Sequence, residues 1–240
     1  MKHVIVYNQI DTDYHGGKRY TNETLFNYFR AQIDWSLHLG WKKEDIIIGT
    51  NFEFEYNGVK NYELTDVCTY SGFNNFWYGA LELMNNGVLD DDFWLHDQDS
   101  WPHEYFDFPN FHGEIAGAEY IGTRQWNCGS IYIKKSAKSV LTYIVDLMRD
   151  NPEVPVSSDE EWIAFCRFDN NSDIKDYLQS IDTRYNCGVT HFSKRYNEAT
   201  KPINVFSFKP DLGRDFDTVS DYLKQEMIDI FKKHKLEVVV

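Results

Sequence analysis

The stretch Phe93-Trp94-Leu95-His96-Asp97-Gln98-Asp99 contains the feature that decides the fold. Its first residues form a short, largely apolar run that is typical of a buried strand, and two aspartates follow directly. Alternate residues of an extended chain point the same way, so the pattern predicts two carboxylates on one side, about 7 Å apart along the chain. We expect Pro102 to stop this strand.

The residues before this stretch alternate between strand and helix patterns. β-branched residues predict a strand at 3–9, and apolar residues at four-residue intervals predict a helix from about 22 to 40. Further strands are expected at 45–49 and 59–64, and a second helix at 72–87. This alternation predicts an α/β fold in which a central sheet is flanked by helices.

The second half of the chain is predicted to continue this pattern, with a strand at 130–133 and helices at 137–148, from Asp159, and at 219–233. We find no internal repeat, low-complexity tract or linker. A chain of 240 residues can bury one sizeable core. We therefore predict a single domain, 1–240.

The net charge and the aromatic content indicate which classes of ligand or partner the protein can bind. The formal charge of −14 disfavours nonspecific binding to nucleic acid or anionic membranes. The local basic group Lys134, Lys135 and Lys138 nevertheless leaves nucleic acid open. Phe, Tyr and Trp are abundant beside polar residues, which suits sugar and base stacking as well as core packing.

No run reaches the roughly 18 apolar residues that a membrane span needs. The start of the sequence, Met1-Lys2-His3-Val4, lacks the pattern of a secretory signal. The cysteines are scattered without metal-site spacing, which favours reduced thiols. We therefore expect a cytoplasmic protein without a membrane span.

Asp97 and Asp99 are candidate ligands of a divalent ion. Carboxylate oxygens suit Mg²⁺ or Mn²⁺, which take their remaining ligands from water and substrate phosphates. The alternative is a polar loop after a strand, because the same tripeptide pattern also occurs at Asp11-Thr12-Asp13. The position of Asp97 and Asp99 in the chain favours the metal site, since Asp97 follows an apolar strand at the end of the alternating strands and helices.

Three segments in order resemble the GT-A glycosyltransferases, including the family 8 type. Residues 93–99 look like the strand and Asp-x-Asp motif of these enzymes. Trp126-Asn127-Cys128-Gly129 is similar to their Asn-x-Gly turn, and Ser157-Ser158-Asp159-Glu160-Glu161 to the acidic helix start that follows. The resemblance implies a Rossmann-like domain with a nucleotide-binding half at about 1–100 and a donor-sugar and acceptor half at about 101–240.

The resemblance also implies roles for individual residues. It assigns the end of the first strand, Tyr7 to Asp11 with Asn8, to base and ribose recognition, and Asn127 and Gly129 to the donor sugar. Many members have a third metal ligand, a His near a Lys-Pro sequence. His191 is the candidate here, although it lies ten residues ahead of Lys201-Pro202.

Other candidates have two interpretations each. Asn74 and Asn75 can contact ribose or base, or cap a helix. Asp159 and Glu160 can supply a catalytic carboxylate or only favour a helix start, where Ser158 and Glu161 form a capping box. Arg124 can pair with donor phosphate or with a surface carboxylate.

We therefore predict a glycosyltransferase that uses Mn²⁺ or Mg²⁺ to move a sugar from a nucleotide-sugar, with UDP preferred, to a glycan or small-molecule hydroxyl. One alternative is a nucleotidyltransferase, for which His15-Gly16-Gly17-Lys18-Arg19 would serve as phosphate loop. The other is a sugar-binding, transferase-like module without catalysis.

Overall fold

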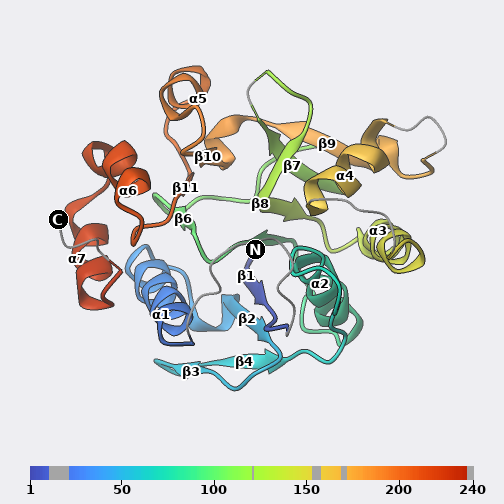
Figure 1. Cartoon of the computed structure of the whole chain (residues 1–240), viewed down its shortest axis with the longest axis horizontal. Helices are drawn as coiled ribbons and strands as arrows, with labels where there is room; N and C mark the ends of the chain where they lie inside the picture. The colour runs from blue at the N-terminus through green and yellow to red at the C-terminus, as the bar shows by residue number, and fades with distance from the viewer. Residues whose placement is uncertain (11–21, 121, 153–157, 169–171, 237–240) are drawn as a thin grey trace.

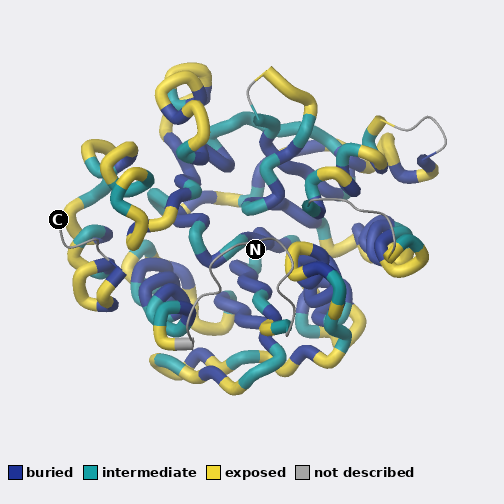
Figure 2. Tube along the Cα trace, viewed as in Figure 1, coloured by how far each residue is buried: buried dark blue, intermediate teal, exposed yellow. Residues whose placement is uncertain are grey.

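The computed structural model describes residues 1–10, 22–120, 122–152, 158–168 and 172–236. Its described residues form a mixed sheet with helices on both faces, as predicted (Figure 1). Figure 2 shows that the strands of the sheet are largely buried between these layers. None of the described helices is both long and apolar enough to cross a bilayer.

The main sheet contains eight strands within the described residues, in the order β3-β4-β2-β1-β5-β8-β7-β9. Their bounds are β1 (Lys2–Tyr7), β2 (Ile46–Thr50), β3 (Glu55–Tyr56), β4 (Val59–Glu63), β5 (Phe93–His96), β7 (Ile115–Glu119), β8 (Trp126–Ile133) and β9 (Leu178–Ile181). β1 pairs in parallel with β2 and β5, whereas β8 runs antiparallel to β5 and β7. The end of β5 and the start of β8 therefore meet at one edge of the sheet.

The helices are α1 (Asn22–His38), α2 (Asn75–Asn85), α3 (Lys138–Asp150), α4 (Asp159–Phe168), α5 (Phe192–Glu198), α6 (Gly213–Val219) and α7 (Gln225–Lys233). α2, α3 and α4 share one hydrophobic core with the sheet, and α1 contributes to a second core on the opposite face. In Figure 1, α1 and α2 lie on either side of β1.

α1 is buried on two sides, which explains its strong apolar pattern. Leu25, Phe29 and Ile33 pack toward the sheet at the predicted four-residue interval. Tyr28 and Trp35 pack instead in a third core with residues of α5 and α7. α1 thus joins the C-terminal segments to the sheet.

A second sheet, unforeseen in the sequence, changes the course of the chain after β5. It has the order β10-β11-β6, with β6 (Ser100–Pro102), β10 (Cys187–Gly188) and β11 (Val205–Ser207). The strand predicted to run through Asp99 ends at His96, because the Ser100 N–H donates to the Asp97 carbonyl and closes a turn. The prediction that both aspartates lie on an extended strand is therefore wrong.

The C-terminal helix predicted at 219–233 is divided. α6 ends at Val219, a 3₁₀ turn follows at Ser220–Tyr222, and α7 begins at Gln225. The remaining predicted helices and strands are present, with ends that differ by a few residues.

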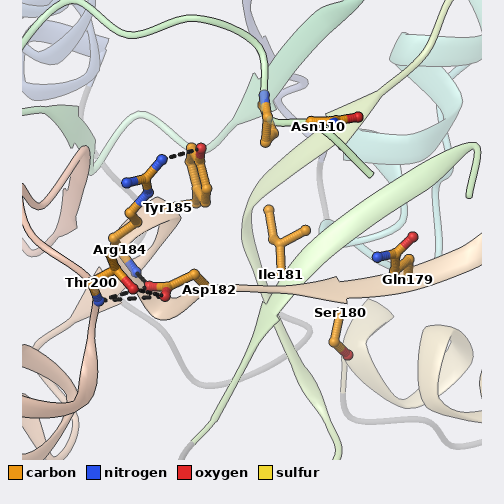
Figure 3. Close-up of a pocket in the computed structure, with 9 residues that line it drawn as sticks. Asn110, Gln179, Ser180, Ile181, Asp182, Arg184, Tyr185 and Thr200 are labelled. Carbon is orange, nitrogen blue, oxygen red and sulfur yellow. Dashed lines mark hydrogen bonds between the residues drawn. The ribbon is translucent and has the colours of Figure 1, made fainter. Parts of the chain in front are cut away.

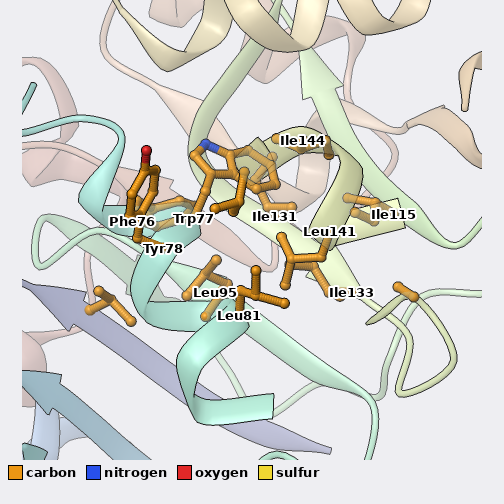
Figure 4. Packing of buried hydrophobic residues seen from close by; sticks show 14 of the residues in the cluster. Phe76, Trp77, Tyr78, Leu81, Leu95, Ile115, Ile131, Ile133, Leu141 and Ile144 are labelled. Carbon is orange, nitrogen blue, oxygen red and sulfur yellow. The ribbon is translucent and has the colours of Figure 1, made fainter. Parts of the chain in front are cut away.

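α2 lies closely against the sheet (Figure 4). Trp77 and Leu81 of α2 belong to the same buried cluster as Ile131 of β8 and Leu141 of α3. Gly79 makes the close approach possible: a Cβ there would stand 2.5 Å from Val6 Cγ1 and 2.8 Å from Leu64 Cδ1. The position of Trp77, which matters for the site, depends on this contact.

We expect Gly79→Ala to lower the free energy of unfolding by about 1–2 kcal/mol, measured by chemical denaturation. Overpacking costs about 1–3 kcal/mol, which exceeds the gain in helix propensity of about 1 kcal/mol. Asn85→Ala, on the exposed end of the same helix, is the matched control and should not destabilise. Equal stability of Gly79→Ala and the wild type would show that α2 moves freely against β1.

Candidate active site

Asp97 and the Asn-x-Gly turn meet at the edge where β5 ends and β8 begins. The Asp97 N–H donates to the Gly129 carbonyl at 3.0 Å. A Cβ on Gly129 would stand 3.2 Å from both Asp97 Oδ2 and Asn127 Oδ1. The antiparallel pairing of β5 with β8 thus brings together two motifs that are about 30 residues apart in sequence.

Asp99 lies in the turn after β5, beside the segment that contains Lys209. The Phe208 N–H donates to the Asp99 carbonyl at 2.9 Å. The positive charge of Lys209 acts on both Asp97 and Asp99. The Lys209-Pro210 sequence follows β11, and the pairing of β11 with β6 brings it close to the two aspartates.

Burial and mutual repulsion make these carboxylates hard to ionise. The pKa of Asp97 is well above its usual value because of burial, with further contributions from Asp99, Asp159 and Glu160. Burial raises the pKa of Asp99 to about 6, although the nearby Lys209 opposes the shift. A cation between the aspartates would relieve both effects.

Asp159, the first residue of α4, is buried and accepts a hydrogen bond from Trp77 Nε1 at 2.8 Å. Burial raises its pKa to about 7, while the Trp77 bond opposes the shift. A residue that only favours a helix start would be exposed to solvent. Asp159 is instead buried, and its charge acts on Asp97.

Glu160 is held by neutral donors. Its Oε1 accepts from the Tyr120 hydroxyl at 2.7 Å and from the Cys128 N–H at 3.3 Å. Burial raises its pKa. Glu161 is exposed, and its backbone N–H donates to the Ser158 carbonyl. The Asp159 carboxylate accepts from backbone N–H groups at the helix start as well as from Trp77, so it combines a helix-start contact with a buried position.

A chain of hydrogen bonds fixes the start of β8 to the second sheet. Asn186 Nδ2 donates to the Asn127 carbonyl at 3.0 Å, and Asn186 Oδ1 accepts from the Ser207 hydroxyl at 2.6 Å. Ser207 and Ser100 hydroxyls lie 2.9 Å apart, and Ser100 donates to the Gly129 carbonyl at 2.7 Å. The second sheet therefore orders the Asn-x-Gly turn.

The predicted nucleotide residues form a buried amide cluster at the end of β1 and the start of α2. Asn8 Nδ2 donates to Asn75 Oδ1 at 3.4 Å, and Asn75 also bonds the backbone of Cys68. Within the described residues, Asn8 Oδ1 and both amide atoms of Asn74 have no hydrogen-bond partner. Such unpaired buried groups need an acceptor or donor from elsewhere.

Tyr7 is half-buried and its ring lies edge-on to Phe29, at 6.5 Å between centroids. The ring therefore packs partly against the core, and its contact with a base stays a prediction. Asp11 and the candidate phosphate loop at 15–19 lie outside the described residues.

Two predicted residues are not brought to the carboxylates by any contact in the described part of the chain. Arg124 is exposed, and its guanidinium lies 5.4 Å from the Phe168 ring centroid. His191 is exposed just before α5, in a left-handed conformation (φ 57°). Its role as a metal ligand stays a prediction.

Several site residues escaped the sequence analysis: Trp77, Tyr120, Asn186, Arg195 and Lys209. In the sequence, Trp77 and Tyr120 resemble core residues. Their polar atoms can be recognised as part of the site only because they bond to residues of α4. Asn186 belongs to an Asn-Cys-Gly tripeptide at 186–188 that also occurs at 127–129. Its repetition was the one available signal.

A separate hollow lies beside the edge strand β9, lined by Ile181, Asp182, Arg184 and Tyr185 among others (Figure 3). Arg184 Nη2 donates to the Tyr185 hydroxyl at 2.7 Å. Asp182 accepts from the backbone of Thr200 and Arg184. The hollow contains none of the predicted site residues.

Comparison with known proteins supports the fold. No protein-family model matches the sequence, and no curated protein matches it significantly. Among solved structures, the chain is similar to a glycosyltransferase involved in glycosylation of the major capsid of PBCV-1, with a TM-score of 0.54, 10% identity, and coverage of 92% of this chain and 100% of that one. It also matches the galactosyltransferase LgtC, solved with donor and acceptor sugar analogs, with a TM-score of 0.53, 10% identity, and coverage of 96% and 100%.

A third similar structure is the glycosyltransferase GlyE of Streptococcus pneumoniae TIGR4, with a TM-score of 0.57 and 10% identity. The match covers 98% of this chain but only 65% of GlyE. At these identities the comparison concerns the fold, and the described chain has the mixed α/β fold of these glycosyltransferases.

Proposed function

We propose that this protein is a metal-dependent glycosyltransferase of the GT-A type that transfers a sugar from a UDP-sugar to a hydroxyl acceptor. The observation that carries the proposal is that Asp97 lies against the Asn-x-Gly turn where β5 and β8 meet, and that the charges of Asp99 and Asp159 act on it there. Without function, such a group of half-buried carboxylates would only destabilise the fold.

Asp97 and Asp99 fit a divalent ion. Both offer oxygen ligands, and their ionisation is disfavoured until a cation is present. No group of three or more His, Cys, Asp or Glu side chains within the described ranges is arranged to hold a metal. Two carboxylates suit Mn²⁺ or Mg²⁺, which complete their shells with water and phosphate oxygens. When bound, the ion would neutralise charge on the diphosphate leaving group.

The remaining groups fit a nucleoside diphosphate. The unpaired amide atoms of Asn8 and Asn74 offer both acceptor and donor, which matches the edge of a base such as uracil. Exposed Lys209, close to both aspartates, supplies positive charge for a phosphate. Asn127 and Gly129 lie beside Asp97, where the transferred sugar would follow the diphosphate.

In the reaction, the bond between the anomeric carbon and the diphosphate oxygen breaks, and a bond to the acceptor oxygen forms. The acceptor hydroxyl loses its proton. Asp159 is our candidate to receive it, because a carboxyl with a pKa of about 7 can exchange protons near neutral pH. Trp77 orients this carboxylate, and Glu160 is a candidate to bind a sugar hydroxyl.

A nucleotidyltransferase or a non-catalytic sugar-binding module would share some of these groups. A nucleotidyltransferase should bind a nucleoside triphosphate more tightly than a UDP-sugar. A sugar-binding module should show no metal-dependent affinity for nucleotides. Thermal shift with a panel of nucleotides separates all three.

We expect UDP or a UDP-sugar with Mn²⁺ to raise the melting temperature, and EDTA to cancel the shift. A ligand that binds only the native state stabilises it by about 2.7 kcal/mol at 100 times its Kd. Asp97→Asn and Asp99→Asn should remain folded and lose the shift and the turnover of UDP-sugar. Asp107→Asn, an exposed aspartate in a loop, is the control and should behave as wild type.

UTP, GDP, CDP and ADP, each with and without metal, complete the panel. A shift in melting temperature with another nucleotide would show that the donor carries that nucleotide in place of UDP. If millimolar nucleotide and Mn²⁺ leave the melting temperature unchanged throughout, the glycosyltransferase proposal fails.

We expect Asp159→Asn to slow transfer by about 10²-fold or more. The variant should also change how stability depends on pH. Asp159 has a raised pKa in the folded state, so the folded protein binds its proton more tightly than the unfolded chain does, and its ionisation destabilises the fold as pH rises. Relative to Asp159→Asn, the wild type should therefore lose about 2 kcal/mol of unfolding free energy between pH 5 and pH 8.

Denaturation of both proteins across this pH range, without metal, measures the difference. Glu161→Gln, on the exposed side of the same helix start, is the control. If Asp159→Asn keeps full activity and its stability follows the wild type at every pH, Asp159 serves only the helix start.

A further inference from the structure

Arg195 of α5 is a fully buried cation whose donors are unused. Its exposed fraction is 0%, and Nε, Nη1 and Nη2 have no hydrogen-bond partner in the part of the chain that the structure describes. Its guanidinium lies 4.6 Å from the Tyr120 ring centroid. That contact offsets part of the charge but leaves every N–H group unpaired. Buried charges are ordinarily paired and hydrogen-bonded, so this one points to an absent partner.

The guanidinium lies next to residues of the candidate active site. Tyr120, beneath it, donates to Glu160, and the charges of Glu160 and Arg195 act on each other without a direct ion pair. On its other side lies Gly188 of β10. A Cβ on Gly188 would stand 2.8 Å from Arg195 Nη1 and 3.1 Å from Asn127 Nδ2. The glycine thus leaves the room that the guanidinium occupies beside Asn127.

Asn127 connects this group to the reaction centre. Its Oδ1 accepts from the Gly129 N–H, and it lies near Asp97 on the Gly129 side. Asn127 is half-buried, and its Nδ2 donates no hydrogen bond to any described residue. Because Asn127 Nδ2 and Arg195 Nη1 both lie against Gly188, an oxygen that accepts from Asn127 Nδ2 has Arg195 Nη1 near it.

We propose that Arg195 and the Asn127 amide bind a carboxylate carried by one of the sugar substrates, so that a hexuronic acid is either the sugar transferred or the sugar that accepts it. The planar fork of arginine matches the two oxygens of a carboxylate. The acidic surroundings favour this specificity, because a carboxylate placed beside Asp97 or Glu160 without Arg195 would be repelled. The proposal rests on the glycosyltransferase function and deepens it.

The test compares charged and neutral sugars by isothermal titration calorimetry with Mn²⁺. One arm uses UDP-glucuronic acid against UDP-glucose, and the other uses methyl glucuronide against methyl glucoside with UDP present. We expect the wild type to prefer the charged ligand by 10-fold or more in one arm. A preference in the first arm identifies the donor, and a preference in the second identifies the acceptor.

Three variants and one control variant examine the cause of the preference for the charged sugar. Arg195→Met should lose the preference, and Arg195→Lys, which keeps the charge but not the fork, should retain only part of it. Gly188→Ala, which places a methyl group against Nη1, should lose it although the charge remains. Lys194→Met, an exposed neighbour on the same helix, removes one charge and should change nothing.

The melting temperature of Arg195→Met gives a second test of the proposal. If Arg195 is kept for binding, Arg195→Met should hold or raise the melting temperature, since it removes an unpaired buried charge. A purely structural Arg195 would show a lower melting temperature and no charge preference in the wild type, which overturns the proposal. An Arg195→Met protein that still prefers glucuronate overturns it as well.

UDP alone with Mn²⁺ is the reference ligand. If UDP binds and no charge preference exists, the carboxylate subsite is wrong and the glycosyltransferase proposal stands. If UDP fails to bind but methyl glucuronide binds in an Arg195-dependent manner, the subsite stands and the glycosyltransferase proposal falls. If neither binds, both are wrong.

Discussion

Repulsion between carboxylates at one edge of the sheet is the constraint around which the rest of the site is arranged. The charges of Asp99, Asp159 and Glu160 act on Asp97 in a partly to fully buried setting, where each ionisation raises the cost of the next. Lys209 acts on Asp97 and Asp99, and Arg195 acts on Glu160, but the pKa values of these carboxyls remain raised. Added positive charge would relieve this repulsion, which is why we propose a cation and a diphosphate as ligands of the site.

The surrounding structure holds these groups in place with neutral donors. Trp77 binds Asp159, Tyr120 and the Cys128 N–H bind Glu160, and backbone contacts fix Asp97 and Asp99. Neutral donors orient a carboxylate without cancelling its charge, whereas a direct arginine partner would remove its affinity for a metal or proton. Arg195 and Glu160 are separated in a way that has the same effect. A direct ion pair between them would leave neither group available to a substrate.

The sequence predicted the parts of this site that depend on local order. The apolar run before Asp97, the Asn-x-Gly turn and the acidic start of α4 each have a short-range pattern, and antiparallel pairing of β5 with β8 was enough to bring them together. The extended geometry of Asp97 and Asp99 was wrong, because the turn after His96 is imposed by the pairing of β6 with β11. Lys209, Asn186 and Arg195 also reach the site through that second sheet. Its strands have two or three residues each, too short for any periodic signal.

The difference between the site residues that the sequence predicted and those that it did not has a physical cause. The first half of the chain places its polar residues at the ends of long-patterned strands, where hydrophobic periodicity reveals them. The second half places its polar residues through long-range contacts between short segments, such as Phe208 with Asp99 and Asn186 with Asn127. In our proposal, the first set mainly binds the nucleoside diphosphate, and the second set mainly contacts the sugar. Sequence patterns in this protein therefore point more directly to the proposed leaving group than to the sugar, because the proposed sugar contacts, such as Arg195, are brought together only in the folded chain.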